Sequence, residues 1–248
     1  MAFWAALLSA RRIRLRSNIR AMRSVGVGLI VTALIAAAGF LLVPQLIVAA
    51  PQEPVMGFVQ KIFYFHVPCA SLLFLSTFAC AAGSIAYLFK GSEAGDRLAV
   101  SSAELAVLFG ACVLVTGPLW GRKAWGVWWQ WDARLTSSLL LVLMMVAYLL
   151  ARRYAGPAGR KLSAALALFA AIDVPLVYKS VDIWRTVHPR TTVVPTLDAR
   201  MRPAFWSSFA LMILVWSLLL AVRLRLERAR ADLVALRLDT EDLLESAA

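Results

Sequence analysis

Residues 135–153 read LTSSLLLVLMMVAYLLARR, an apolar run that ends in two arginines. A helix needs roughly 17–25 apolar residues to cross a bilayer, and loops on the cytoplasmic side carry an excess of Lys and Arg. This stretch therefore predicts one transmembrane helix with a basic cytoplasmic end.

Five further runs of the same kind flank this one along the chain. The six predicted spans are about 25–49, 68–89, 98–119, 135–151, 162–178 and 204–222. Pro175 lies inside the fifth run, where we expect it to kink the helix. The chain is 61% hydrophobic and 16% charged over 248 residues, whereas soluble domains are roughly 45–50% apolar and about 25% charged. We therefore predict an all-α membrane protein and exclude a soluble enzyme.

The basic residues predict the orientation of the spans. The net charge is +12, but the arginines flank apolar runs and form no separate basic domain, so we do not expect nucleic acid as a partner. With both termini inside, 17 of the 26 Lys and Arg residues are cytoplasmic and 9 lie outside. We predict a membrane protein with a basic cytoplasmic N-terminus (1–24), a membrane domain (25–222) and a charged cytoplasmic helix (223–248). For this last helix, partner docking and plain solvation are equally open.

A loop between the third and fourth spans is rich in tryptophan. Residues 120–134 read WGRKAWGVWWQWDAR and contain Trp120, Trp125, Trp128, Trp129 and Trp131. An interfacial aromatic belt is the alternative, but a belt places only one or two such residues at each helix end. In a helix, Trp125, Trp128, Trp129 and Asp132 share one face. We predict a short interfacial helix within the loop 119–134, which offers a flat aromatic surface to a large planar ligand.

The chain has two histidines. His66 lies in KIFYFHVP before the second span, and His188 lies in DIWRTVHPR between the fifth and sixth, so both belong to loops on the same predicted outer face as the tryptophans. Trp184 precedes His188 by four residues, one helical turn away. Two imidazoles are too few for a zinc site but suit the two axial positions of a heme iron. We therefore predict that His66 and His188 ligate the iron of heme b.

Basic side chains on the outer face are candidates to pair with the two heme propionates. Lys61 lies five residues before His66, and Arg134 closes the tryptophan loop. Guanidinium and ammonium groups form strong charge-assisted contacts with carboxylates. Lys61 and Arg134 are the predicted partners; further candidates are Arg122, Lys123, Arg185 and Arg190.

The segment WGVWWQWDARLTSSLLL (125–141) resembles the WWD signature of heme-handling proteins. Together with six spans and one histidine in each flanking outer loop, it resembles the cytochrome c maturation protein C family (CcmC, heme exporter protein C). The likeness covers most of 25–222, including FHVP at His66 and PLVYKSVDIWRTVHPR at His188. Ile183 is a departure, because the family pattern leads us to expect a second tryptophan beside Trp184.

The resemblance implies heme delivery and no enzymatic activity. Heme would be held at the outer (periplasmic) face of a bacterial inner membrane and passed to the membrane-anchored chaperone CcmE, with CcmD and the ABC-type subunits CcmA and CcmB as further partners. Asp132 belongs to the signature; we expect it to cap or orient Arg134 and the tryptophan helix.

Two other functions compete with heme delivery as interpretations of this sequence. A heme-conducting permease subunit is favoured by Glu104 and Asp173, because acids inside predicted spans are candidates for a transport path. An electron-transfer cytochrome b subunit is less favoured, because neither histidine lies in the middle of a span.

Overall fold

Six long helices dominate the computed structural model, which describes residues 2–189 and 193–245. They are α1 (Ala2–Ala49), α2 (Phe63–Lys90), α3 (Glu93–Trp125), α4 (Ala133–Tyr154), α5 (Gly159–Ile183) and α6 (Arg202–Glu245), with two short 3₁₀ turns, η1 (Phe58–Ile62) and η2 (Gly156–Ala158). All six are long and apolar enough to cross a membrane. The predicted all-α membrane fold is confirmed.

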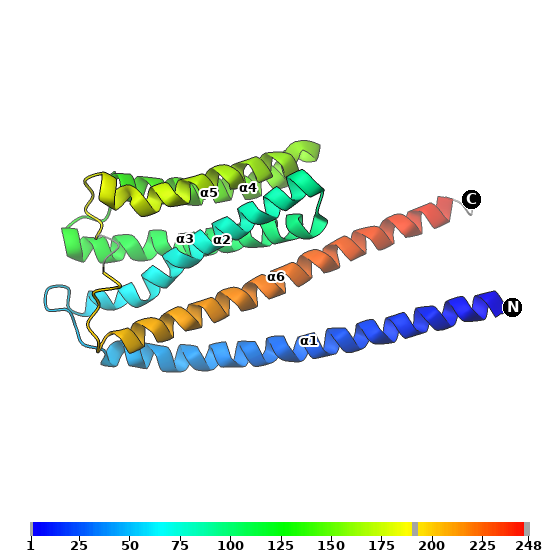
Figure 1. Cartoon of the computed structure of the whole chain (residues 1–248), viewed down its shortest axis with the longest axis horizontal. Coiled ribbons are helices and arrows are strands. Elements are labelled where there is room, and N and C mark those ends of the chain that lie inside the picture. Colours follow the sequence, from blue (N-terminus) through cyan, green and yellow to red (C-terminus); the bar gives the residue numbers. More distant parts are fainter. Residues whose placement is uncertain (1, 190–192, 246–248) are drawn as a thin grey trace.

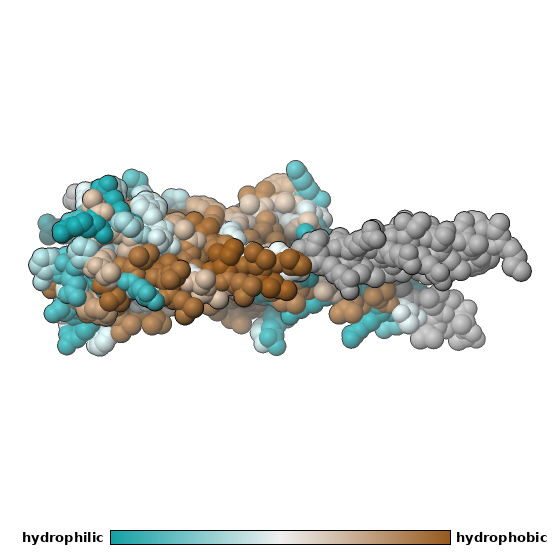
Figure 2. Space-filling model, turned by 90° about the horizontal axis from the view of Figure 1, so that it is seen from below, coloured by the Kyte–Doolittle hydropathy of each residue, from teal (hydrophilic) through white to brown (hydrophobic). Residues whose placement is uncertain are grey.

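The helices α2 to α5 form a bundle, and α1 and α6 lie alongside it and extend past one end (Figure 1). Both chain termini lie at that end. The loop residues 50–57, 126–132, 184–189 and 193–201 lie at the other end. A broad apolar zone covers the middle of the surface, with hydrophilic residues gathered beside it (Figure 2). This is the arrangement that a lipid bilayer requires of a multi-pass protein.

Helix α2 is central and packs against α3, α5 and α6. Its fully buried Leu72 and Leu73 share a core with Phe109, Leu141 and Met145 of the neighbouring helices. A Cβ atom on Gly83 would lie 2.4 Å from the backbone oxygen of Gly95 on α3. Small residues permit such close approach of helices in membranes, so this glycine sets the α2–α3 distance.

In two helices, α2 and α3, the difference from the predicted bounds concerns the site. Helix α2 begins at Phe63 and not near residue 68, so His66 lies inside its first two turns and not in a loop. Pro68 cannot donate to the Tyr64 carbonyl, as a helical residue normally would. The hydroxyl of Ser208 on α6 donates to that carbonyl instead, at 2.6 Å. Helix α3 similarly continues through Pro118 as far as Trp125.

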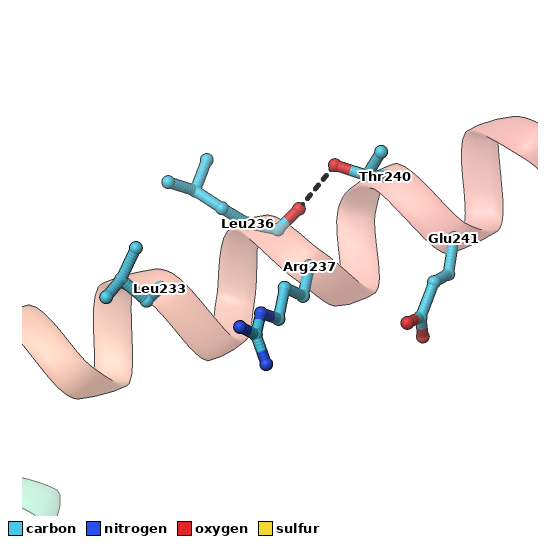
Figure 3. Close-up of a pocket in the computed structure, with 5 residues that line it drawn as sticks. All are labelled: Leu233, Leu236, Arg237, Thr240 and Glu241. Carbon is cyan, nitrogen blue, oxygen red and sulfur yellow. Dashed lines mark hydrogen bonds between the residues drawn. The ribbon is translucent and has the colours of Figure 1, made fainter.

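The outer helices are longer than their apolar spans. Helix α1 is continuous from Ala2 across residue 25, and α6 continues to Glu245. A shallow hollow on this part of α6 is lined by Leu233, Leu236, Arg237, Thr240 and Glu241 (Figure 3). All five side chains come from one helix, so the hollow is a notch in its surface and not a cavity between elements.

Candidate functional site

His66 projects from α2 toward α3 and is held there by Thr116. Its Nδ1 lies 2.8 Å from the Thr116 hydroxyl, which itself donates to the Cys112 carbonyl at 2.6 Å. The single hydroxyl hydrogen is used in that second bond, so the Thr116 oxygen accepts from Nδ1–H. This leaves the lone pair of His66 on Nε2. Gly117 leaves room for the ring, because a Cβ atom there would lie 3.4 Å from His66 Cε1.

His188 reaches the same tautomer by a different route. Its Nδ1 lies 2.8 Å from the backbone oxygen of Pro189, which can only accept, so Nδ1 carries the hydrogen and Nε2 is free. Burial, the main cause, and the Arg134 guanidinium lower the pKa of His188 from 6.5 to about 4, against smaller opposing effects of the Pro189 carbonyl and Asp132. The imidazole is therefore neutral at physiological pH, as a metal ligand must be.

The two histidines share one neighbourhood. Arg134 and His188 lie within electrostatic range of His66. The Trp125 ring lies against His188, with centroids 6.5 Å apart, and Trp120 packs edge-on against Trp125 at 5.3 Å. Residues separated by more than 100 positions in sequence are thus brought to one end of the bundle, as the sequence predicted for the histidines and the tryptophans.

The tryptophan loop has a different conformation from the one predicted. We expected a short helix with Trp125, Trp128, Trp129 and Asp132 on one face, and this prediction was wrong. Helix α3 ends at Trp125, because Gly126 adopts φ +77°, and residues 126–132 are not helical. Glycine in the left-handed region is a common helix C-terminus. The rings therefore form two groups and not one flat surface.

The second group of rings lines a cleft. Trp129 and Trp131 pack edge-on at 5.7 Å, and with Leu114 and Leu139 they line a shallow apolar hollow of about 310 Å³. The indole Nε1 of Trp129 is buried and has no hydrogen-bond partner within the described part of the chain. Buried donors are normally paired, so this one is available to a ligand. Trp128 and Trp131 are largely exposed.

Asp132 joins the tryptophan loop to the His188 segment, a role that sequence reasoning only partly anticipated. Its Oδ1 accepts from Leu135 N at 2.8 Å, the N-cap of α4. Its Oδ2 accepts from the Thr186 hydroxyl and from Val187 N, the latter at 3.0 Å. Asp132 thus caps α4 and not the predicted tryptophan helix, and its contacts to the His188 segment were not predicted. The feature of the sequence that could have indicated these contacts is Thr186, a hydroxyl donor two residues before His188.

Arg134 anchors α4 to α5. Its Nη1 donates to the carbonyls of Val177 at 2.6 Å and Tyr178 at 3.1 Å, near the C-terminus of α5, where positive charge is favourable. Within the described residues, the hydrogen bonds of Arg134 use only this one nitrogen, so its Nη2 and Nε remain for a carboxylate ligand. Pairing with a propionate stays a prediction.

Lys61 has another role in the structure. Its ammonium is buried and donates to the backbone oxygens of Ala50 and Pro51, at the end of α1. It therefore fastens the end of α1 to η1, and this geometry does not favour pairing with a propionate.

The other basic candidates and Trp184 each have their own surroundings. Arg122 caps the end of α3 by donating to the Gly126 carbonyl, and Lys123 and Arg185 are exposed. Arg190 lies outside the described residues. Trp184 follows the end of α5 in an extended conformation, φ −116° and ψ 158°, so the predicted helical turn that would join it to His188 is wrong.

The two acids inside the spans have unequal surroundings. Glu104 is paired with Arg223 of α6, which also donates to Glu227 at 3.1 Å. Asp173 is buried on α5, and its Oδ2 has no partner among the described residues. Only Asp173 is therefore left without compensation.

The donor set fits a heme and not a bare metal ion. No group of three or more His, Cys, Asp or Glu side chains gathers as a metal site anywhere in 2–189 or 193–245. A porphyrin supplies four nitrogens of its own, so it needs only two further ligands.

Comparison with known proteins agrees with this chemistry. The sequence model of the heme exporter protein C family matches residues 2–243. The chain belongs to the heme exporter protein C family. Heme exporter protein C of Bradyrhizobium diazoefficiens is 31% identical over 199 residues, covering 79% of this chain and 75% of that protein. The Escherichia coli K12 protein of the same name is 35% identical over 176 residues, covering 66% and 69%.

A plant relative carries the same likeness. A putative cytochrome c biosynthesis ccmC-like mitochondrial protein of Marchantia polymorpha is 30% identical over 144 residues, covering 58% of this chain and 61% of that protein. As a member of the heme exporter protein C family, this multi-pass membrane protein handles heme in cytochrome c maturation.

Proposed function

We propose that this protein holds heme b at the periplasmic face of the bacterial inner membrane and passes it to the chaperone CcmE. The iron is ligated by Nε2 of His66 and Nε2 of His188. The observation that carries this proposal is the matched tautomer of the two rings. Each commits its Nδ1–H to a protein oxygen and leaves Nε2 without a hydrogen.

The surrounding groups suit the rest of the porphyrin. The rings of Trp120, Trp125, Trp129 and Trp131 offer aromatic cover, and the free nitrogens of Arg134 and the indole of Trp129 offer donors to the propionates. An exposed rim at Trp128 and Trp131 leaves one edge open to an acceptor. The protein supplies binding and orientation and makes no covalent bond, so it acts as a carrier and not as an enzyme.

The proposed orientation follows from charge and helix number. An even number of spans places both termini on one side, and the excess of Lys and Arg assigns that side to the cytoplasm. The loops that carry His188 and the tryptophans then face the periplasm. CcmD and the ABC-type pair CcmA and CcmB are the further partners that we expect for release of the loaded chaperone.

An absorption spectrum of the purified protein tests the ligand assignment. Wild-type protein is expected to show six-coordinate low-spin heme, and His66→Ala or His188→Ala should give five-coordinate heme or none. An unchanged spectrum in either variant overturns ligation by two histidines. Co-expression with CcmE then tests delivery: heme should accumulate on CcmE with the wild type and not with either variant.

A heme-conducting role is a second candidate, supported by the buried carboxyl of Asp173 alone. Buried ionisable groups within membrane spans often mark transport paths. If heme reaches the periplasmic site through this protein, Asp173→Asn should reduce heme loading in cells. It should not change the affinity of purified protein for added heme. Unchanged loading in cells excludes this role for Asp173.

A further inference from the structure

The two proposed iron ligands differ in how firmly the surrounding structure holds them. His66 is part of α2, a helix of 28 residues, and is bonded across to Thr116 of α3. His188 lies in the segment between α5 and α6, beyond the last helical residue, Ile183. One ligand therefore belongs to the packed helical body, whereas the other depends on local contacts.

Those local contacts converge on Asp132. Within residues 184–189, Thr186 and Val187 both donate to Oδ2 of Asp132, and the amide of His188 donates to the Thr186 hydroxyl oxygen at 3.1 Å. The other described hydrogen bond from this segment back to a helix joins Trp184 N to Ser180 O, before the histidine. One carboxylate oxygen thus ties the His188 turn to the start of α4.

We infer that Asp132 is a positioning residue for His188, and that His188 is the ligand that leaves the iron when heme is handed on. This inference rests on the proposed function. The same carboxylate ends the tryptophan loop and begins α4 through its bond to Leu135 N. Displacement of the tryptophan loop and release of His188 are therefore linked through one side chain, while His66 keeps hold of the iron.

The release step is a simple ligand exchange. The bond between iron and Nε2 of His188 breaks, and its electron pair remains on the imidazole nitrogen. Water or a ligand of the acceptor then fills the vacated position. No electron or proton transfer is needed, because Nδ1 already carries its hydrogen against the Pro189 carbonyl.

The chain offers variants that separate this role from the helix cap. In Asp132→Asn the amide oxygen can still accept from Leu135 N, but the amide nitrogen cannot accept from Val187 N. Thr186→Val removes the hydroxyl that bridges Asp132 and His188, and Thr186→Ser restores it. Asp198→Asn is the matched control, because Asp198 lies in the same segment and is paired with the exposed Arg200.

The experiment has one readout without heme and one with it. Amide hydrogen exchange of residues 184–189 in the heme-free protein should be about tenfold or more faster in Asp132→Asn and Thr186→Val, since bonds to a charged group are lost. Thr186→Ser and Asp198→Asn should match the wild type. With heme bound, resonance Raman spectra should show a larger five-coordinate fraction in the first two variants, and carbon monoxide should bind the ferrous iron faster.

The outcomes separate this inference from the proposed function. Unchanged exchange and unchanged coordination in both Asp132→Asn and Thr186→Val overturn the inference while leaving ligation by two histidines intact. Wild-type protein without bis-histidine heme overturns the proposed function, whatever the exchange data show. A further measurement identifies the leaving ligand. Imidazole is first added to His66→Gly and to His188→Gly, so that it occupies the position of the missing histidine, and carbon monoxide is then added to each. If carbon monoxide displaces the ligand at the His66 position first, His188 is not the leaving ligand.

Discussion

At the end of the bundle that carries the chain termini, charges are paired with one another inside the protein. Asp96 is buried and accepts from both Arg152 and Arg160, and Arg160 also bonds Glu93 at 2.7 Å. At the opposite end, His66 and His188 keep Nε2 free, and the Trp129 indole lacks a partner among the described residues. At both ends, contacts between polar side chains and their partners involve α3, α4 and α5.

This difference separates groups that stabilise the fold from groups available to a ligand. A buried polar group without a partner costs free energy, so a protein keeps one where something else completes it. Both carboxylate oxygens of Asp96 are paired within the protein, whereas the histidine end keeps Nε2 of both rings free. Changes at the first end should lower stability and spare heme binding, and changes at the second should do the reverse.

The largest effect is expected at the histidines. Replacing His66 or His188 by glycine removes an axial ligand, so six-coordinate low-spin heme should be lost almost completely. Imidazole added to the purified variant can occupy the vacated position and should restore the spectrum. Visible absorption and resonance Raman spectra provide the measurement. Failure of imidazole to restore either variant would indicate that the substitution acts through misfolding.

The next largest effect is expected at the other end, from Asp96→Asn. This change leaves the partly exposed Arg152 and Arg160 without their buried carboxylate, and a hydrogen bond to a charged group contributes about 1.5–3 kcal/mol. The midpoint of thermal unfolding in detergent should fall clearly, while the spectrum of bound heme stays that of the wild type. Asp198→Asn removes an exposed carboxylate and should change neither. A heme spectrum altered by Asp96→Asn would contradict the conclusion that this end of the bundle stabilises the fold without affecting heme binding.

Arg134 and Lys61 both anchor helices, but only Arg134 keeps nitrogens that its hydrogen bonds within the described residues do not use. Arg134→Gln should weaken heme retention about tenfold or more, since a hydrogen bond to a charged group contributes about 1.5–3 kcal/mol. Lys61→Gln should lower thermal stability without changing heme affinity, because its ammonium holds the end of α1. Heme titration of both purified variants is the measurement. Equal losses of affinity would instead restore Lys61 as a propionate partner.

A smaller effect is expected at Trp129. Trp129→Phe keeps an aromatic ring but removes the buried Nε1 donor, so heme affinity should fall by about two- to tenfold, the value of one ordinary hydrogen bond. Trp206→Phe is the matched control, because Trp206 is more than half exposed on α6. Heme content and transfer to CcmE should follow the same order. Equal effects at the two positions would mean that the loop is only an aromatic belt.

The smallest effect concerns pH. With its pKa lowered from 6.5 to about 4, His188 of the heme-free protein should remain neutral across physiological pH. Its neutral state stabilises the fold fully above pH 6.5, and this contribution is lost as the pH falls to about 4. ¹⁵N-histidine NMR spectra of the His66→Gln variant can follow His188 alone. Protonation near pH 6.5 would show that the ring is not buried in solution.

Much of this protein could be predicted from local sequence. Long apolar runs specify spanning helices because the bilayer requires every backbone group to be bonded internally. The placement of the two histidines and the tryptophan loop at one end of the protein was also predictable, because these residue types are chemically distinctive and few. Helix ends were less so: Gly126 ends α3 inside the tryptophan loop, and α2 continues through Pro68 because Ser208 on another helix satisfies the free carbonyl.

What only the tertiary structure decided is the set of partners. Thr116 is an ordinary residue of an apolar helix in sequence, and its contact with His66 spans 50 positions. Asp132 and Thr186 form a hydrogen bond across 54 positions, and Lys61 donates to a backbone oxygen at the end of α1. Hydrogen bonds act over about 3 Å, so they depend on how helices pack. Hydropathy acts through whole segments, so the sequence alone determined the six spans, whereas packing decided which polar groups were bonded within the protein and which were left available to a ligand.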